Sequence, residues 1–261
     1  MTLDILFILP ILAGFISGVF VGAASGTAAS LMLPILTVFM GHPIYKSIGT
    51  SLFVDCFIGI TAGLIFLKNK NVDLTSSTIL IISGIIGAVL GSQFTARTPQ
   101  FSLNIIIGFF LVIVGLNFIV NGIRKNVDFV KNKINLDFFK SHLKKSLVFF
   151  GLIIGFSSGF FGVGSGAMVT MVMVFILTYD IHTAIGTSLL VMFFIAGAGA
   201  TTHFLNNEFI PHVAIISGLS AIVGAFISSS FANRIDEDKL GRFVGFIILI
   251  LGFLMFVKLM I

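Results

Sequence analysis

Long apolar segments separated by short polar stretches make up almost the whole chain of 261 residues. About 20 apolar residues are enough for a helix to cross the hydrocarbon core of a bilayer. Only 10% of the residues are charged, whereas soluble domains carry about 25%, so a water-facing exterior cannot be covered. We therefore predict an all-α, multi-pass protein of the cell membrane. The segments fall at 5–42, 47–67, 75–96, 101–122, 147–178, 184–205, 210–232 and 239–260.

The charged residues lie mainly between these segments and give a net charge of +5. Basic loops of this kind suit anionic lipid head groups and the positive-inside rule, and no basic-aromatic surface for nucleic acid is visible. The opening stretch MTLDILFILPILAGF has no basic region before its apolar run. We therefore expect it to be the first membrane helix and not a removable signal peptide.

The pentapeptide IGTSL occurs at 48–52 and again at 185–189. The shift along the chain that places Ile48 on Ile185, which we call the repeat offset, also places other matched residues on each other. With small gaps, GFISGVFVGAASG (14–26) aligns with GFSSGFFGVGSG (155–166). We interpret the chain as two homologous four-segment repeats, at 1–122 and 147–261, joined by a basic cytoplasmic linker at 123–146. The ungapped matches are Asn69 with Asn206, Gly87-Ala88 with Gly224-Ala225, FTAR (94–97) with FANR (231–234) and Gly108-Phe109 with Gly245-Phe246.

The first and fifth segments are too long for single crossings. Straight helices over 5–42 and 147–178 would measure about 57 and about 48 Å, whereas the core is about 30 Å thick. Each contains a Gly/Ser-rich interruption, VGAASGT (21–27) and GVGSGA (162–167). We expect each segment to enter the membrane, break and return to the same side. That arrangement puts 12 Lys/Arg inside and 3 outside, against 10 and 5 for eight single crossings, which favours inverted repeats.

Inverted repeats built around broken helices are typical of secondary transporters, whose substrate sites lie where the breaks meet. Backbone groups freed by a break must line a polar cavity or be buried in protein, and the N-termini of half-helices favour anions. We therefore predict an anion site between the two breaks, with alternating access at the repeat interface. The predicted substrate-binding residues are Gly22, Ser25, Gly26, Thr27, Thr50, Ser51, Gly162, Gly164, Ser165, Gly166, Thr187 and Ser188.

The two IGTSL motifs place hydroxyl groups near the starts of the second and sixth segments. From there Thr50, Ser51, Thr187 and Ser188 could reach unpaired N–H groups, a returning half-helix or a bound anion. The alternative is helix packing, since small and hydroxyl-bearing residues commonly join membrane helices.

Asp55 is the one acidic residue deep within a segment, where a charge costs roughly 2.5–3.5 kcal/mol. We consider two roles for it, a carrier of a coupled proton or a hydrogen-bonded residue that fixes neighbouring helices. Its repeat counterpart is Met192, so the repeat architecture does not require the carboxyl. We expect His203 to be an interfacial residue, and Arg97 and Arg234 to anchor helix ends.

Signatures of enzymes and metal sites are missing from the sequence, including HExxH, the P-loop and clustered Cys/His residues. We therefore predict no catalysis, cofactor or metal. The expected partners are a small anion and membrane lipids, without nucleic acid, and a homo-oligomer is compatible with the sequence. Two alternatives to a transporter stay open, a passive anion channel and a membrane scaffold or accessory subunit.

The duplicated pattern, GAASGTAASLMLP (22–34) followed by IGTSL, resembles the sulfite exporter TauE/SafE family of membrane permeases. The resemblance covers roughly residues 10–258. It implies eight segments in two repeats and the movement, mostly export, of sulfite, of sulfonates such as sulfoacetate, or of related anions. The chain departs from the pattern in two places, since the first break has Ala-Ala-Ser where glycines are common and Val174 stands where Pro34 would repeat.

Overall fold

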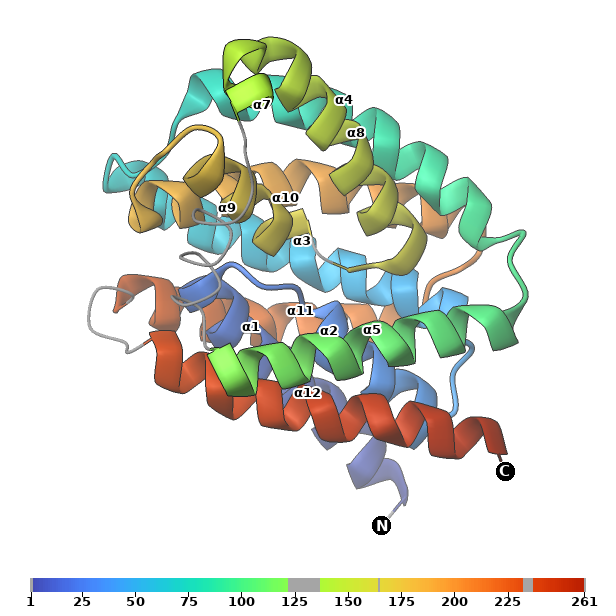
Figure 1. The fold of residues 1–261 in the computed structure, drawn as a ribbon. Helices are drawn as coiled ribbons and strands as arrows, with labels where there is room; N and C mark the ends of the chain where they lie inside the picture. Colours follow the sequence, from blue (N-terminus) through green and yellow to red (C-terminus); the bar gives the residue numbers. More distant parts are fainter. Residues whose placement is uncertain (1, 122–136, 164, 232–236, 261) are drawn as a thin grey trace.

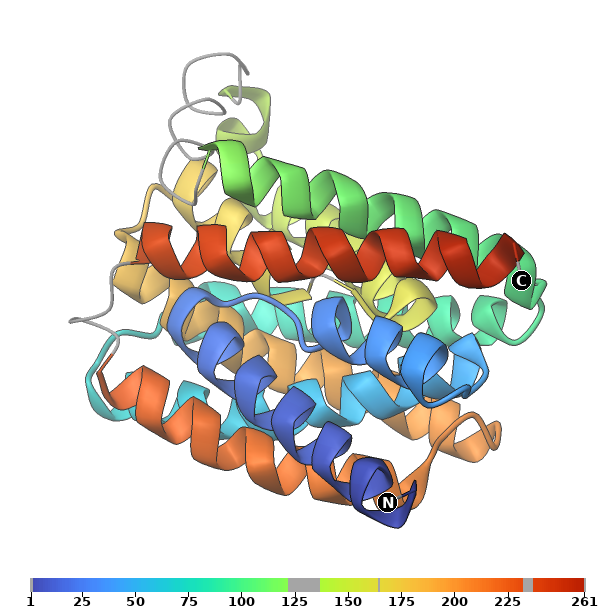
Figure 2. The same ribbon diagram turned by 90° about the horizontal axis from the view of Figure 1, so that it is seen from below.

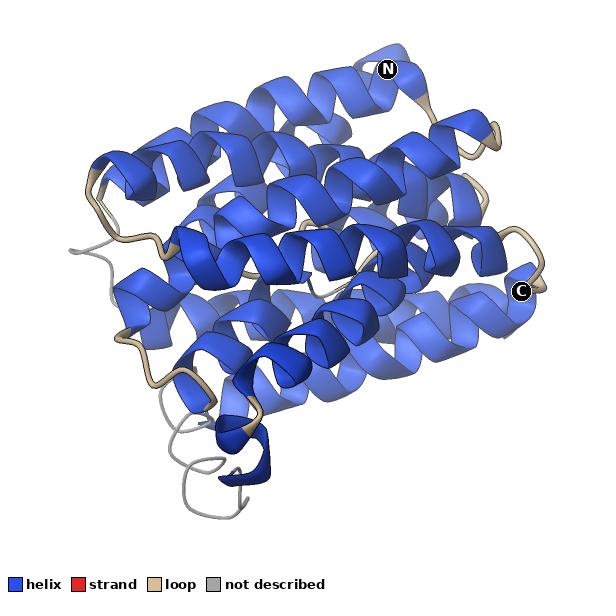
Figure 3. Ribbon diagram, turned by 90° about the horizontal axis from the view of Figure 1, so that it is seen from above, coloured by secondary structure: helices blue, strands red, loops and turns tan. Residues whose placement is uncertain are grey.

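The computed structural model describes residues 2–121, 137–163, 165–231 and 237–260, and these residues form helices and connecting loops (Figure 3). Within these ranges, seven helices are long and apolar enough to cross a membrane, which confirms a multi-pass membrane protein. The elements are α1 Thr2–Ala24, α2 Ala29–Pro34, the π-helix η1 Ile35–Phe39, α3 Ile44–Lys68, α4 Leu74–Thr95, α5 Gln100–Asn121, α7 Asp137–Ser141, α8 Leu143–Phe161, α9 Ser165–Phe175, α10 Ile181–Leu205, α11 Pro211–Ser230 and α12 Glu237–Met260.

The first and fifth predicted segments are both broken helices, as expected. The first breaks between α1 and α2, and the fifth breaks between α8 and α9. Figure 2 shows the chain running along α1, reversing at the break and coming back along α2 and η1. With 23 residues, α1 is about 35 Å long and can cross the core, whereas α9 with 11 residues measures only about 16 Å. Each hairpin therefore has a long arm and a short arm.

Backbone geometry recurs at the repeat offset. Both ends of helix α10 coincide with the ends of α3 when the chain is shifted by this offset. The same shift superimposes three pairs of residues with positive φ: Ser25 with Gly162, Gly41 with Thr178, and Lys70 with Asn207. Positive φ is uncommon outside glycine, so this agreement supports our interpretation of a duplication. It also extends the ungapped offset to the breaks, where the sequence alignment needed gaps, and it pairs Ser25 with Gly162.

The main helix contacts join the first half of the chain to the second. Helix α1 packs along α11, α8 along α4, α3 against α10 and α5 against α12 (Figure 1). Glycines let these backbones approach closely, as in other membrane helix pairs. A Cβ on Gly155 of α8, for example, would collide with the carbonyl oxygen of Gly84 on α4. The two halves of the chain therefore pack against each other along the length of their helices.

Arg234 lies outside the described residues, and so does the first part of the predicted linker at 123–146. Its later part contains α7, and α8 begins at Leu143, shortly before the predicted start of the second repeat. The repeat boundaries stay predictions.

Candidate functional site

The two helix breaks touch each other in the interior of the bundle. Thr27 Oγ1 in the first break lies 3.3 Å from the carbonyl oxygen of Gly162 in the second. Gly166, in the first turn of α9, lies so close to the first break that a Cβ there would be 2.5 Å from the carbonyl oxygen of Gly26. Both contacts depend on small residues, and they place the start of α9 against the first break.

Three buried or partly buried hydroxyl groups connect the first break to α9 and α10. Ser25 and Ser188 are hydrogen-bonded through their Oγ atoms. Thr170 Oγ1 on α9 donates to Ser188 Oγ at 2.8 Å, and Ser188 Oγ also lies 2.7 Å from the carbonyl oxygen of Ile185. Since each hydroxyl has one proton and two lone pairs, the cluster can rearrange its donors toward a bound group.

The Asp55 carboxylate holds the first break in place. Its Oδ2 accepts a hydrogen bond from Thr27 Oγ1 at 2.8 Å, and its Oδ1 accepts from the backbone N–H of Ala28 at 2.6 Å. The side chain is buried, with 1% exposed. Met192, also buried, occupies the corresponding position in α10. The N-terminus of α2 therefore already faces a carboxylate, and the two breaks differ in their electrostatics.

The threonine of each IGTSL motif, Thr50 or Thr187, hydrogen-bonds to the opposite half of the protein. We call these two contacts the clasps. Thr50 Oγ1 accepts a hydrogen bond from the backbone N–H of Ile210 at 3.1 Å, and Thr187 Oγ1 accepts from the N–H of Asp73 at 2.9 Å. Ile210 and Asp73 are the N-cap residues of α11 and α4, and the repeat offset places one on the other. The preceding glycine leaves room for the opposite loop, since a Cβ on Gly49 would collide with the carbonyl oxygen of Glu208.

Replacing either clasp threonine with valine is expected to lower stability by a similar amount. Valine keeps the shape of threonine but leaves the N–H of Ile210 or Asp73 without its acceptor, which costs about 1–3 kcal/mol. The measurement is the apparent melting temperature of Thr50→Val and Thr187→Val in detergent. Thr201→Val is the matched control, because the exposed Thr201 hydroxyl bonds only within its own helix turn, to Gly197. Unchanged melting temperatures for both clasp variants would contradict this role.

Asp73, the N-cap of α4, also forms a hydrogen bond with the loop that follows α9. Its Oδ2 accepts a hydrogen bond from the Tyr179 hydroxyl at 2.8 Å. Partial burial acts to raise the pKa of Asp73, but hydrogen bonds from Ser76, Tyr179 and the first-turn N–H groups outweigh it and hold that pKa below its usual value. Asp180, the N-cap of α10, likewise has a lowered pKa because Thr183 and nearby N–H groups hydrogen-bond its carboxylate.

The predicted site residues divide into two groups. The structure gathers most of them around the breaks, and a Cβ on Gly162 would lie 3.2 Å from Ser51 Oγ. Three lie elsewhere: Thr50 and Thr187 form the clasps, and Gly22 packs on α11, where its Cβ would meet Ser228 Oγ. Gly164 lies outside the described residues. The residues at or beside the breaks are Ser25, Gly26, Thr27, Ser51, Asp55, Gly162, Ser165, Gly166 and Ser188.

Thr170 and Phe20 contact the breaks and are not among the predicted residues. Thr170 belongs to the hydroxyl cluster. The sequence could have indicated it, because Thr170 lies one helical turn after the predicted site residue Gly166. The Phe20 ring covers Gly26, where a Cβ would lie 2.6 Å from a ring carbon.

His203, expected at the membrane interface, is instead fully buried. Its Nδ1 lies 2.7 Å from Glu208 Oε2, and its Nε2 lies 3.0 Å from the carbonyl oxygen of Gly159. A carbonyl only accepts, so Nε2 carries a proton and donates it. The pair therefore links the end of α10 to α8, one turn before the second break.

The sequence matches known proteins along most of its length. A model of the family described as sulfite exporter TauE/SafE matches residues 10–255. This chain belongs to that family. Its relatives include the "Probable membrane transporter protein YunE" of Bacillus subtilis, 23% identical with 91% of this chain and 89% of YunE covered. A "Probable membrane transporter protein" of Xylella fastidiosa is 28% identical, with 91% and 88% covered. No solved structure matches the chain significantly.

Membership and fold together make this chain a multi-pass membrane transporter of the TauE/SafE family, consistent with the absence of enzyme signatures in the sequence. The relatives are named as transporters without a stated substrate.

Proposed function

We propose that this chain exports small sulfur-containing anions, sulfite or organosulfonates, from the cell by alternating access at the repeat interface. The contact between the two breaks carries this proposal, because it brings the start of α9 and the Ser25–Ser188–Thr170 hydroxyl cluster to one place inside the bundle. Hydroxyl and backbone donors can hold an anion and release it readily, because the described residues at the two breaks include no Lys or Arg.

The asymmetry between the breaks favours an anion position nearer the second one. The Asp55 carboxyl already accepts the hydrogen bonds of the Thr27 hydroxyl and the Ala28 N–H, so these donors at the start of α2 are not available to an anion. At the second break, the residue that corresponds to Asp55 is the uncharged Met192 of α10. The hydroxyl cluster lies beside the start of α9. We therefore expect Ser25, Ser188 and Thr170 to contact the anion.

The direct test is flux of sulfite in vesicles that contain the purified protein alone. A transporter is expected to move sulfite down its gradient with saturable kinetics. Flux that rises linearly with concentration would favour a passive anion channel. Absence of flux, with activity restored by a co-purified partner, would favour a membrane scaffold or accessory subunit.

Proton coupling through Asp55 gives a further expected result. If the carboxyl carries a proton, an imposed pH gradient drives sulfite uphill in the wild type, and Asp55→Asn abolishes this uphill movement while downhill flux continues. Asparagine keeps an acceptor for Thr27 or Ala28, so the break is largely preserved. Equal pH-driven accumulation by wild type and Asp55→Asn would leave Asp55 the structural role of holding the first break.

A further inference from the structure

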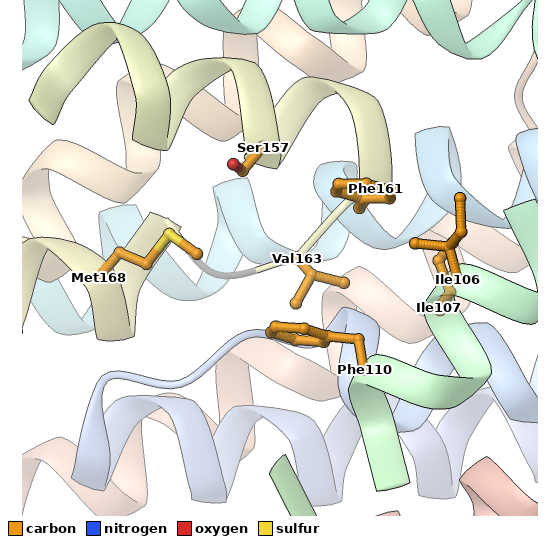
Figure 4. A pocket seen from close by; sticks show the side chains of 7 residues that line it. All are labelled: Ile106, Ile107, Phe110, Ser157, Phe161, Val163 and Met168. Carbon is orange, nitrogen blue, oxygen red and sulfur yellow. The ribbon is translucent and has the colours of Figure 1, made fainter. Parts of the chain in front are cut away.

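A small apolar cavity lies directly beside the second break (Figure 4). Its volume is about 90 Å³, and its walls come from α5, α8, the break and the first turn of α9. Figure 4 shows Val163 of the break and Phe110 of α5 facing each other across it. The lining side chains are Ile106, Ile107, Phe110, Ser157, Phe161, Val163 and Met168.

The repeat offset accounts for the open space beside the second break. In the first half, the Phe20 ring lies over Gly26 and fills the space beside the first break. The repeat offset places Phe20 on Ser157 and Gly26 on Val163. The second half thus has a serine where the first has the covering phenylalanine, and the space beside its break is left open.

The cavity adjoins the place where the proposed anion would sit. Val163 and Met168, which line it, come two residues before Ser165 and two residues after Gly166 along the chain, so the cavity is next to the first turn of α9. Single waters need roughly 10–15 Å³, and apolar cavities stay dry, with one of about 150 Å³ accepting benzene. At about 90 Å³, this space suits two or three aliphatic carbons.

We infer that the cavity receives the uncharged aliphatic tail of an organic anion whose charged group lies at the start of α9. The inference rests on the proposed function and narrows its substrate class from sulfur anions in general to short alkanesulfonates. A second charged end is excluded, since a carboxylate moved into an apolar cavity loses its hydration without a partner. Sulfoacetate should therefore gain nothing from the cavity.

The test is a set of dissociation constants measured by calorimetry on detergent-purified protein. The ligands are sulfite, methanesulfonate, propanesulfonate and sulfoacetate. Each buried methylene is worth about 0.8 kcal/mol, or roughly fourfold in Kd. Propanesulfonate is therefore expected to bind about 15-fold more tightly than methanesulfonate, and sulfoacetate no more tightly than methanesulfonate.

Ser157→Phe copies the first half and should fill the cavity. We expect the propane-to-methane ratio of Kd values to collapse toward one, whereas Ser157→Ala, which leaves the space open, should keep the 15-fold ratio. Ser157→Leu is the second filling variant in case phenylalanine prevents folding. The ratio of the two Kd values is compared because a misfolded fraction of the protein affects both measurements equally.

Three results would overturn the inference, and they have different meanings. Equal Kd values for methane- and propanesulfonate in the wild type would remove the tail site but keep an anion transporter. Phospholipid retained by the wild type and lost in Ser157→Phe, seen by native mass spectrometry together with equal Kd values, would assign the cavity to a lipid acyl chain. No binding of any anion, joined with no sulfite flux in vesicles, would remove the proposed function itself.

Discussion

Replacing Gly166 with leucine is expected to reduce anion flux at least a hundredfold in a protein that still inserts into the membrane. A Cβ at this position would lie 2.5 Å from the carbonyl oxygen of Gly26 and 3.0 Å from both oxygens of Ser25. Real Cβ atoms do not approach backbone oxygens so closely, so the two breaks must separate. The larger side chain would also occupy the space beside the hydroxyl cluster. Vesicle flux of sulfite, normalised to inserted protein, measures the effect.

Gly197→Ala is the matched control for this experiment. Gly197 lies in α10, and a Cβ there would meet only Cys56 Sγ, at an ordinary contact distance of 3.5 Å. We expect wild-type flux from this variant and an intermediate loss from Gly166→Ala. Wild-type flux from Gly166→Leu would place the transport path away from the meeting of the breaks.

Replacing Glu208 with leucine is expected to destabilise the fold by about 3–5 kcal/mol, the usual loss when one partner of a buried pair is removed. His203 is 0% exposed and Glu208 6%, so solvent cannot replace the lost contact to Nδ1. The pair also holds Gly159 of α8 through His203 Nε2. A fall of roughly 10 °C in the apparent melting temperature is expected for a chain of this size.

The first half of the chain suggests how this loss can be repaired. Phe66 and Asn71 are the counterparts of His203 and Glu208 at the repeat offset, and there the corresponding loop packs without a histidine–carboxylate pair. The double variant His203→Phe/Glu208→Asn copies those residues and should recover much of the stability lost in Glu208→Leu. If Glu208→Leu melts at the wild-type temperature, the buried pair is not a source of stability.

Much of the fold follows from residue patterns that act locally. Apolar length predicted the membrane segments, and the excess length of the first and fifth segments predicted their breaks, because a helix cannot exceed the membrane thickness indefinitely. The repeated IGTSL pointed to matched positions in the two halves. Those patterns depend on periodicity and segment length, which a sequence displays directly.

The partners of individual side chains could not be predicted in this way. Thr50 and Thr187 bind backbone N–H groups, which every residue but proline carries, so nothing in the sequence marks Ile210 or Asp73 as their partners. Thr170 has no hydroxyl counterpart in the first half, where Leu33 stands, so the repeat could not reveal it. The buried His203–Glu208 pair likewise looks like a polar helix end until α8 is packed over it.

The clasp formed by Thr50 has a consequence for the order of events during synthesis. Its partner Ile210 lies 160 residues further along the chain. At about 5–20 residues per second, the ribosome needs roughly 8–32 s to make that stretch. During this interval the Thr50 hydroxyl has only its bond to Lys46 within α3, and the face of α3 that meets α10 has no partner helix. The first four segments must therefore wait in the bilayer, and the lipids around them act as temporary neighbours until the second half arrives.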